Sequence, residues 1–407
     1  MTARLSRRAV IVGGLARLCV AAPARAASSA DDALRALLDA VAGGADRLAE
    51  VRRFPESGLS PSSRLDLRTV RAGLVIDAEL ARRFPDPKGA MSPARYGLLL
   101  RRITGDDTDP AEALERLEHE CRALLAEADR RLKTLGLASG TVGARFTTLW
   151  RDPRWLYADD DAGRNRAVAD MNRALVSARH LTIAAFPGLA PRCLNVGVHR
   201  MSAADAAAGR GGYRDLPTAG VQGNYTVDLK DIRRRPSWTL TGVVHHELLP
   251  GHMVQMPTEA IAAPHPLRLK YAPGFAEGWA IHAEQFAADR GAFVDDAMGM
   301  IGHLHWMLFR IGRALADLRI HLSGWSIERA REQLVAWQGE PAYFAPFNTD
   351  LARIAAEPAV RVAEALAWLT IADLARIDSI KAHRIALAHG RMRNDELRRI
   401  MHKEASR

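Results

Sequence analysis

Apolar side chains recur at three- and four-residue steps along most of this 407-residue chain, and this spacing places them on one face of an α-helix. The clearest early case begins at the start signal Asp109-Pro110 and stops at Gly136. A second helical block runs over residues 161–185 and ends before a Phe-Pro-Gly sequence. The pattern therefore predicts a mainly α protein.

The pattern changes between residues 189 and 236, where two short segments alternate apolar and polar residues as β-strands do. These segments are residues 193–198 and 224–229, and a loop rich in Gly and Ala separates them at 203–220. From residue 237 the helical pattern returns and continues to the end. We expect one mostly helical domain over residues 27–407, with a small β element before the helix at 237–255 and a motif core at 210–330.

The composition is that of an ordinary soluble globular protein, with 48% hydrophobic and 26% charged residues. This excludes a disordered or collagen-like chain. A formal net charge of +10 would by itself favour a nucleic-acid or membrane-surface partner. However, the pattern shows no basic helix-turn-helix, zinc finger or aromatic strand platform. We therefore expect no nucleic-acid partner.

The first 26 residues carry half of that charge and resemble an export signal. Arg4, Arg7 and Arg8 precede a modestly apolar run at 9–22, and Ala24-Arg25-Ala26 follows. The arginine pair is typical of the twin-arginine variety. We expect cleavage near Ala26 and a periplasmic or secreted protein; the alternative is an amphipathic N-terminal helix of a cytosolic protein. No other segment approaches the ~20 apolar residues of a membrane span, so no stable membrane insertion is expected.

After such cleavage two cysteines would remain, Cys121 and Cys193. Two are too few for a Cys₄ zinc site. They could form one disulfide in an oxidising compartment, but the sequence does not say whether they meet. The oligomeric state is likewise open.

The strongest candidate for chemistry is the pair His246-Glu247 on an apolar helix, followed by His252. In zinc hydrolases with this layout, two imidazoles bind the metal and the glutamate acts as general base for the metal-bound water. The second histidine usually comes four residues later. Here it comes six later, a rotation of about 600°, which places it on another face of a regular helix.

Pro250-Gly251 changes that expectation, because a proline inside a helix removes a hydrogen bond and crowds the preceding turn. A bulge at this point would bring His252 back towards His246. In an unbroken helix, His245 and His252 would share a face instead. The remaining alternative is a kinked core helix with incidental histidines, although burying them unpaired would be costly.

A third metal ligand is expected shortly after this segment. Glu277 and Glu284 are seven residues apart on a predicted helix and so share a face. An exposed pair of glutamates is the simplest interpretation of this spacing taken alone. Their place about 25 residues after the histidine segment favours Glu277 as the ligand.

A polar stripe follows on another apolar helix, formed by Arg310, Arg313, Asp317 and His321. A solvated helix face would explain it. Alternatively, Asp317 and His321 form an orienting pair, because carboxylates in the outer layer of metal sites commonly hold ligand imidazoles. We expect Asp317, His321, Arg313 and Glu284 in that outer layer.

At these three segments the sequence resembles a large bacterial family catalogued as a domain of unknown function. Its members carry H-E-x-x-P-G-H-x-x-Q, then F-x-E-G-W-A-x-Y-x-E, then R-x-x-R-x-x-x-D-x-x-x-H-x-x-x-W. The matching residues here are His246, Glu247, Pro250, Gly251, His252 and Gln255, then Phe275, Glu277, Gly278, Trp279, Ala280 and Glu284, then Arg310, Arg313, Asp317, His321 and Trp325. The resemblance is strong over roughly 210–330 and weaker on either side.

Members of that family are regarded as zinc metallopeptidases of the mostly helical, gluzincin-like kind, so the resemblance implies this fold and activity. Three departures stand out. His282 replaces a tyrosine, Met253 replaces a frequent second histidine, and a C-terminal motif P-G-Q-A-x-x-Y is degenerate at Glu364 and Trp368. If the missing tyrosine normally steadies the oxyanion, this protein would be slow, altered in substrate or inactive.

The leading hypothesis is an exported zinc-dependent peptidase, with His246, His252 and Glu277 as ligands and Glu247 as general base. Manganese or cobalt could occupy the same donor set. The backbone at 224–227 would align a peptide substrate by strand addition. The alternative is a non-catalytic protein that binds metal or peptide.

Three side chains are candidates for stabilising the tetrahedral oxyanion: His282, Tyr225 and Tyr271. Each lies in or near the motif core and offers an N–H or O–H donor. Substrate length, residue preference and exo- or endo-cleavage are not encoded in these patterns.

Overall fold

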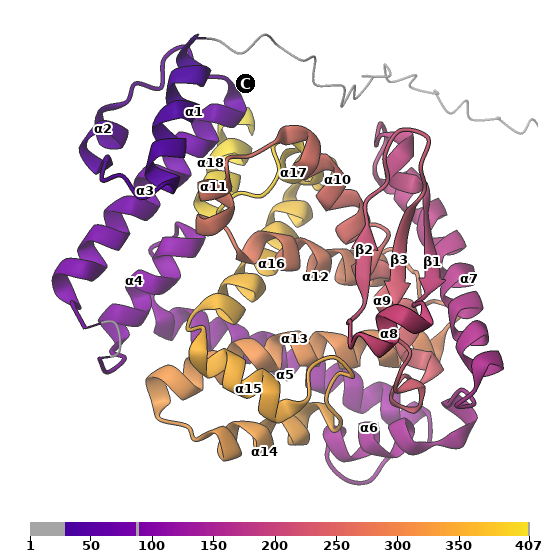
Figure 1. The fold of residues 1–407 in the computed structure, drawn as a ribbon. Helices are drawn as coiled ribbons and strands as arrows, with labels where there is room; N and C mark the ends of the chain where they lie inside the picture. Colours follow the sequence, from indigo (N-terminus) through magenta and orange to yellow (C-terminus); the bar gives the residue numbers. More distant parts are fainter. Residues whose placement is uncertain (1–28, 87–88, 406–407) are drawn as a thin grey trace, which may run out of the picture.

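The computed structural model describes residues 29–86 and 89–405 and is mostly helical, with one small sheet (Figure 1). The predicted mainly α fold with a small β element is confirmed. The expected export segment 1–26 lies outside the described residues. The helices that precede the sheet are α1 (Ser29–Ala42), α2 (Leu48–Arg53), α3 (Pro61–Arg83), α4 (Pro93–Thr104), α5 (Pro110–Thr134), α6 (Val142–Arg151) and α7 (Asp161–Ala185).

The two early helices begin and end where their sequence signals place them. The Asp109 carboxylate caps α5 by accepting a hydrogen bond from the Ala111 N–H at 2.7 Å. After α5, Gly136 adopts a positive φ of 81°, a conformation that glycine takes without a Cβ clash. α7 spans the predicted 161–185 block. Cys121 in α5 and Cys193 are both buried free thiols.

The sheet has the order β1-β3-β2, with β1 (Val196–Arg200) parallel to β3 (Gly223–Val227) and β2 (Tyr213–Asp215) antiparallel to it. The prediction was partly wrong here. Residues 191–194 form a 3₁₀ turn, and the expected loop at 203–220 contains α8 (Ala203–Ala207) and β2. Both edges of β3 are paired, so the expectation that residues 224–227 receive a peptide strand is wrong.

The remaining helices follow the sheet and include the predicted histidine helix, which is divided in two. They are α9 (Leu240–Glu247), α10 (His252–Ala262), α11 (Pro266–Tyr271), α12 (Gly274–Asp289), α13 (Ala297–Ser323), α14 (Ile327–Gln338), α15 (Phe347–Ala356), α16 (Val360–Ile377), α17 (Ser379–Ala388) and α18 (Asn394–Ala405). None of the described helices is long and apolar enough to cross a membrane.

α13 runs through the centre of the molecule, and most of its side chains are buried. It packs against α5, α9 and α16, and α12 lies along α16. Gly278 explains how closely α12 and α16 approach, because a Cβ at this position would collide with Ala367. This packing fixes α12 and therefore the direction of the carboxylates it carries.

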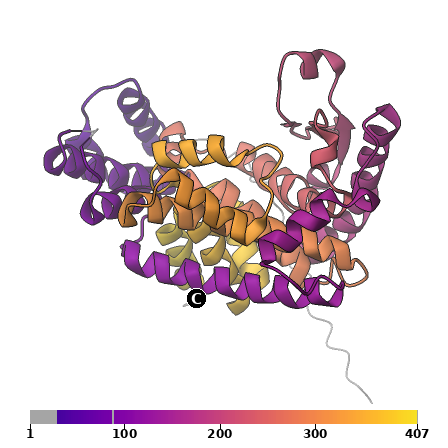
Figure 2. The same ribbon diagram turned by 90° about the horizontal axis from the view of Figure 1, so that it is seen from below.

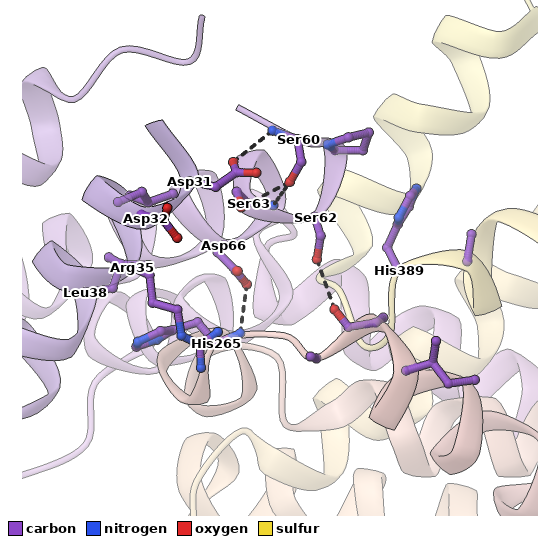
Figure 3. Close-up of a pocket in the computed structure, with 16 residues that line it drawn as sticks. Asp31, Asp32, Arg35, Leu38, Ser60, Ser62, Ser63, Asp66, His265 and His389 are labelled. Atoms are coloured by element: carbon purple, nitrogen blue, oxygen red, sulfur yellow. Dashed lines mark hydrogen bonds between the residues drawn. The ribbon is translucent and has the colours of Figure 1, made fainter. Parts of the chain in front are cut away.

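The N-terminal helices and the sheet lie towards opposite ends of the molecule, with the central helices between them (Figure 2). The N-terminal end is tied to the segment between α10 and α11. The Asp66 carboxylate of α3 accepts a hydrogen bond from the His265 N–H at 3.1 Å, and Asp31 accepts one from the Ser60 N–H at 2.9 Å (Figure 3). A pocket lined by these residues opens between α1, α3 and the start of α11.

Candidate metal centre

The two candidate histidine ligands meet because the helix breaks between them. α9 ends at Glu247 and α10 begins at His252, so the bend at residues 248–251 interrupts the regular helix. A Cβ at Gly251 would collide with the His246 carbonyl oxygen, so the bend requires glycine. As a result, the imidazole rings of His246 and His252 lie 4.9 Å apart between centroids and nearly perpendicular.

The alternative pairing of His245 with His252 is wrong. The Nδ1 atom of His245 lies 3.0 Å from the Leu249 carbonyl oxygen, and a carbonyl can only accept, so Nδ1 carries the proton. The ring packs edge-on against Phe293, with 5.7 Å between centroids. His245 therefore belongs to the other side of α9.

Glu277 of α12 completes a cluster of three possible ligands. Its Oε2 atom lies 3.5 Å from His246 Nε2, and its Oε1 atom lies 3.3 Å from His252 Nε2. One possible ligand atom from each of the three residues lies within 4.8 Å of the other two. Within residues 29–86 and 89–405, this is the one group of three or more His, Cys, Asp or Glu side chains that meets this criterion. The Glu277 side chain is 36% exposed, whereas the imidazoles of His246 and His252 are buried. The cluster is therefore open on the side of Glu277.

These residues fit a metal ion. Among the described residues, neither buried ring nitrogen of His252 has a partner in hydrogen-bond geometry, although Nε2 lies 3.3 Å from Glu277, and this is costly for an imidazole. His246 Nδ1 lies 2.7 Å from the Glu284 carboxylate, so Nδ1 carries the proton and Nε2 presents its lone pair towards Glu277. Two imidazole nitrogens and one carboxylate oxygen form a donor set of catalytic zinc sites.

Glu284 and Arg310 support His246 from behind. Glu284 is buried, and Arg310 Nη2 lies 3.5 Å from its Oε1 atom and 3.3 Å from His246 Nδ1. Burial raises the pKa of Glu284, but the hydrogen bond with His246 and the charge of Arg310 outweigh it and lower the pKa. The predicted placement of Glu284 behind a ligand imidazole agrees with this geometry.

Glu247 stands beside the three candidate ligands at the end of α9. Arg214 of β2 donates to its Oε2 atom from Nε at 2.6 Å and from Nη2 at 2.5 Å. Burial raises the pKa of Glu247, but Arg214 and the two histidines outweigh it and hold the pKa below its usual value. The carboxylate is therefore ionised at neutral pH and has Oε1 free of Arg214.

The polar stripe on α13 divides between two tasks. Arg310 reaches the His246–Glu284 pair, whereas Arg313 forms an ion pair with Asp350, with Nε 2.9 Å from its carboxylate. The charges of Glu364, Asp350 and Glu277 raise the pKa of Arg313 against the effect of burial, so Arg313 lies within electrostatic reach of a candidate ligand. Its predicted place near the cluster is retained, without a direct contact to a ligand among the described residues.

The expectation that Asp317 and His321 orient a ligand imidazole is wrong. The Asp317 carboxylate accepts hydrogen bonds from the Tyr96 hydroxyl at 2.8 Å and from the Ala359 and Arg361 N–H groups at 3.0 and 3.2 Å. It therefore holds the beginning of α16. His321 Nε2 lies 3.2 Å from the Ile354 carbonyl oxygen and 3.8 Å from Asp317. The stripe faces the interior because it ties α13 to α15 and α16.

His282 does not face the cluster, so its predicted catalytic role is wrong. Its Nε2 atom lies 2.8 Å from His383 Nε2, and the two rings pack among Phe186, Trp279 and Phe286. Five residues after Glu277 on a helix, a side chain points about 140° away from it. This rotation explains why a neighbour in sequence lies outside the site.

The two tyrosine candidates differ in position. Tyr271 donates to Asp77 at 2.7 Å, on the side of α3, and is excluded from the cluster. The Tyr225 hydroxyl lies 3.5 Å from that of Tyr343. Burial raises the pKa of Tyr225, and the charge of Glu247 raises it further. Tyr225 is thus the predicted hydroxyl that lies near Glu247.

A small pocket adjoins the cluster, and part of its wall comes from segments to which no sequence pattern points. Its lining residues are Gly242, Val243, His246, Glu247, Glu284, Trp306, Arg310, Tyr343 and Phe344. In this wall, Tyr343 and Phe344 come from the connection between α14 and α15. Arg214, which lies outside the lining but holds Glu247, comes from β2. No spacing pattern links these residues to the histidine segment. The pocket of Figure 3 lies elsewhere, and its lining includes none of the candidate ligands His246, His252 and Glu277.

In a comparison with known families, residues 8–376 match the family described as "Bacterial protein of unknown function (DUF885)". The comparison with curated proteins gives no match.

Two similar solved structures are each described as a "putative lipoprotein". The one from Colwellia psychrerythraea has a TM-score of 0.69 and 22% sequence identity, covering 92% of this chain and 69% of its own. The one from Shewanella oneidensis, of unknown function, has a TM-score of 0.61 and 15% identity, covering 91% and 72%. At these identities the likeness concerns the fold.

Proposed function

This chain belongs to the bacterial family DUF885, and we propose that it is a zinc-dependent hydrolase that cleaves peptide bonds. One observation carries the proposal: His246, His252 and Glu277 converge from three helices while Glu247 lies beside them. The hydrogen bond between His246 and Glu284 supports it, because ligand histidines usually donate their second N–H to a carboxylate.

In this proposal zinc, when bound, supplies Lewis acidity that makes water nucleophilic at neutral pH and polarises the peptide carbonyl. Glu247 takes the proton from the attacking water at Oε1, since Oε2 accepts both donors of Arg214, and passes it to the leaving amine nitrogen. Glu284 keeps the proton of His246 on Nδ1, which leaves Nε2 for the metal. The Tyr225 hydroxyl is the nearest predicted donor for the oxyanion.

The substitution Glu247→Gln tests this mechanism. The amide keeps the shape of the carboxylate but accepts no proton, so turnover of a peptide library is expected to fall at least a hundredfold while bound zinc stays unchanged. Glu332→Gln, an exposed change on α14, serves as the matched control. Unchanged cleavage by the Glu247→Gln protein would overturn the mechanism.

A second candidate function is metal or peptide binding without cleavage. It is favoured by Trp368, which is buried in α16 and donates from Nε1 to Gln285 at 2.6 Å, so this position offers no hydroxyl to a substrate. Tight zinc binding without hydrolysis of any peptide in a broad library would support this candidate over the first.

We also infer that the protein is exported. The arginine pair, the apolar run and the Ala-Arg-Ala sequence of residues 1–26 support this, as do the lipoprotein descriptions of the two similar structures. Replacing both Arg7 and Arg8 with Lys should retain the full-length protein in the cytoplasm. Unchanged export of that variant would rule out the twin-arginine route.

A further inference from the structure

Arg214 uses one edge of its guanidinium and leaves the other open. Its Nε and Nη2 atoms both donate to Glu247 Oε2, and within the described part of the chain the Arg214 side chain makes no other hydrogen bond or ion pair. A guanidinium has five N–H donors in a rigid fork, so Nη1 and the outer N–H of Nη2 remain. The Arg214 side chain is 24% exposed, and within the described residues none of its nitrogen atoms is both buried and without a hydrogen-bond partner. The open edge therefore faces accessible space.

A second cation lies close to the same place. Arg235 is 2% exposed, and both of its Nη atoms are buried without a hydrogen-bond partner in residues 29–86 and 89–405. Its Cζ atom lies 3.1 Å from the ring centroid of Tyr343, whose hydroxyl is 3.5 Å from that of Tyr225. The Tyr343 ring is a cation–π partner for this guanidinium, but buried N–H groups without an acceptor are costly and call for an explanation.

The sheet register brings these groups together. Arg214 and Tyr225 are directly opposite each other in the antiparallel β2–β3 pair, so their side chains lie on the same face. Arg235 acts on the pKa of the Tyr225 hydroxyl as a nearby positive charge, and Glu247 acts on it as a nearby negative one. Two arginines and two tyrosine hydroxyls thus converge beside Glu247.

We propose that Arg214, backed by Arg235, Tyr225 and Tyr343, is a subsite for a carboxylate group of the substrate peptide. The inference rests on the proposed function and names its substrate class. An arginine edge with two parallel N–H groups matches a carboxylate in bidentate geometry, which gives direction as well as attraction. The carboxylate is either the C-terminus of the peptide or an acidic side chain next to the cleaved bond.

Three substrates with the same cleaved bond test the proposal: a peptide with a free C-terminus, its C-terminal amide, and the amide with Glu in place of Gln beside the bond. A charge-assisted hydrogen bond of about 1.5–3 kcal/mol corresponds to roughly ten- to hundredfold in kcat/KM, so we expect one carboxylate substrate to be preferred by that factor. The preferred arm tells the C-terminus from the side chain.

The variant Arg214→Met should bring the preference ratio close to one, mainly by raising KM for the carboxylate substrate. The ratio cancels any effect of the substitution on Glu247 that is common to all three substrates. Arg235→Met should lower the ratio less, because Arg235 is buried behind the tyrosines. Arg200→Met is the matched control, since Arg200 lies on β1 and pairs with Asp161. No preference in the wild type, or an unchanged ratio in Arg214→Met, would overturn the proposal.

A binding measurement separates this inference from the proposed function. Calorimetry of the metal-free full chain needs no turnover, and it uses two acids, N-acetylglycylglycine and N-acetylglutamate α-amide, each beside its uncharged amide. We expect one of the two acids to bind at least tenfold more tightly than its amide in the wild type, and no more tightly than its amide in Arg214→Met. Failure of the wild type to cleave any peptide would contradict the proposed function, whereas equal binding of both acids and their amides would contradict the carboxylate subsite.

Discussion

Two pairs of buried histidines lie on either side of α12 and differ in what surrounds them. His246 and His252 face the carboxylates of Glu277 and Glu284. The other pair, His282 and His383, is surrounded by aromatic rings, and the two imidazoles contact each other with their Nε2 atoms 2.8 Å apart. The same residue type thus occupies a candidate cation site in one case and a packed core in the other. The carboxylates, rather than the histidines, distinguish the candidate metal centre.

The electrostatics of the two pairs differ at His246 alone, because burial lowers the pKa of His252 as it lowers those of His282 and His383. Burial lowers the pKa of His383 to about 4, and burial together with His383 lowers the pKa of His282 well below its usual value. Both imidazoles are neutral at pH 7. At His246, burial and the charge of Arg310 act in the same direction, but Glu277 and Glu284 outweigh them and raise the pKa. A buried histidine without an anion is therefore a core residue in this protein.

The largest expected effect in this comparison follows from removing a carboxylate behind a ligand. In Glu284→Gln, His246 loses a charged acceptor and its Nε2 becomes a weaker donor to the metal, so zinc affinity should fall about 10- to 100-fold. Competition with a chromophoric chelator measures this. The matched change on the other side of α12, His282→Phe, should leave zinc affinity within about twofold. Equal losses in both proteins would erase the distinction between the two pairs.

A second prediction separates the two halves of the α13 stripe. Asp317→Ala leaves three buried donors without an acceptor and should reduce the free energy of unfolding by about 2 kcal/mol, as measured by denaturant titration. Zinc stoichiometry should not change, because Asp317 holds α16 rather than a ligand. A loss of zinc from a folded Asp317→Ala protein would restore the role that the sequence predicted.

The smallest effect concerns a third buried histidine of the aromatic kind, His305, which packs against Phe146, Trp150 and Trp238. Burial lowers its pKa to about 4. As pH falls, the His305 side chain takes up a proton in the unfolded chain before it does so in the folded protein. The contribution of His305 to the free energy of unfolding is therefore complete above pH 6.5 and is lost towards pH 4.

The substitution His305→Phe should remove this pH-dependent contribution to the free energy of unfolding. Between pH 7 and pH 5.5 the wild type should lose about 1 kcal/mol more stability than the variant. Urea titrations at the two pH values measure the difference. Parallel losses in the two proteins would show that His305 is not the neutral core residue described here.

Much of the fold and the centre of the site could be predicted from local patterns. The limits of α5 and α7 follow from caps, prolines and glycines close to them in sequence. The meeting of His246 and His252 follows from Pro250-Gly251, which prevents a regular helix between them. Glu284 was identified because seven residues bring it back to the face of Glu277. Each of these signals acts within two helical turns.

The misplaced residues depend on contacts between distant segments. Arg214 reaches Glu247 only because β2 pairs with β3, and the three-residue β2 has no alternation to reveal it. The role of Asp317 could not be predicted, because its carboxylate accepts hydrogen bonds from the N–H groups at the start of α16, more than 40 residues later in the chain. His282 stands at the tyrosine position of the second family motif, but it lies about 140° around α12 from Glu277 and therefore meets His383 of α17 instead of the candidate metal centre.

Zinc content tests the central claim most directly. Purified wild-type protein, saturated with zinc and dialysed, should retain one equivalent per chain, and so should His383→Ala. His252→Ala should retain none, because it lacks one of the three ligands while its fold remains intact by circular dichroism. Zinc retained by His252→Ala, or absent from the wild type, would contradict a metal centre at His246, His252 and Glu277.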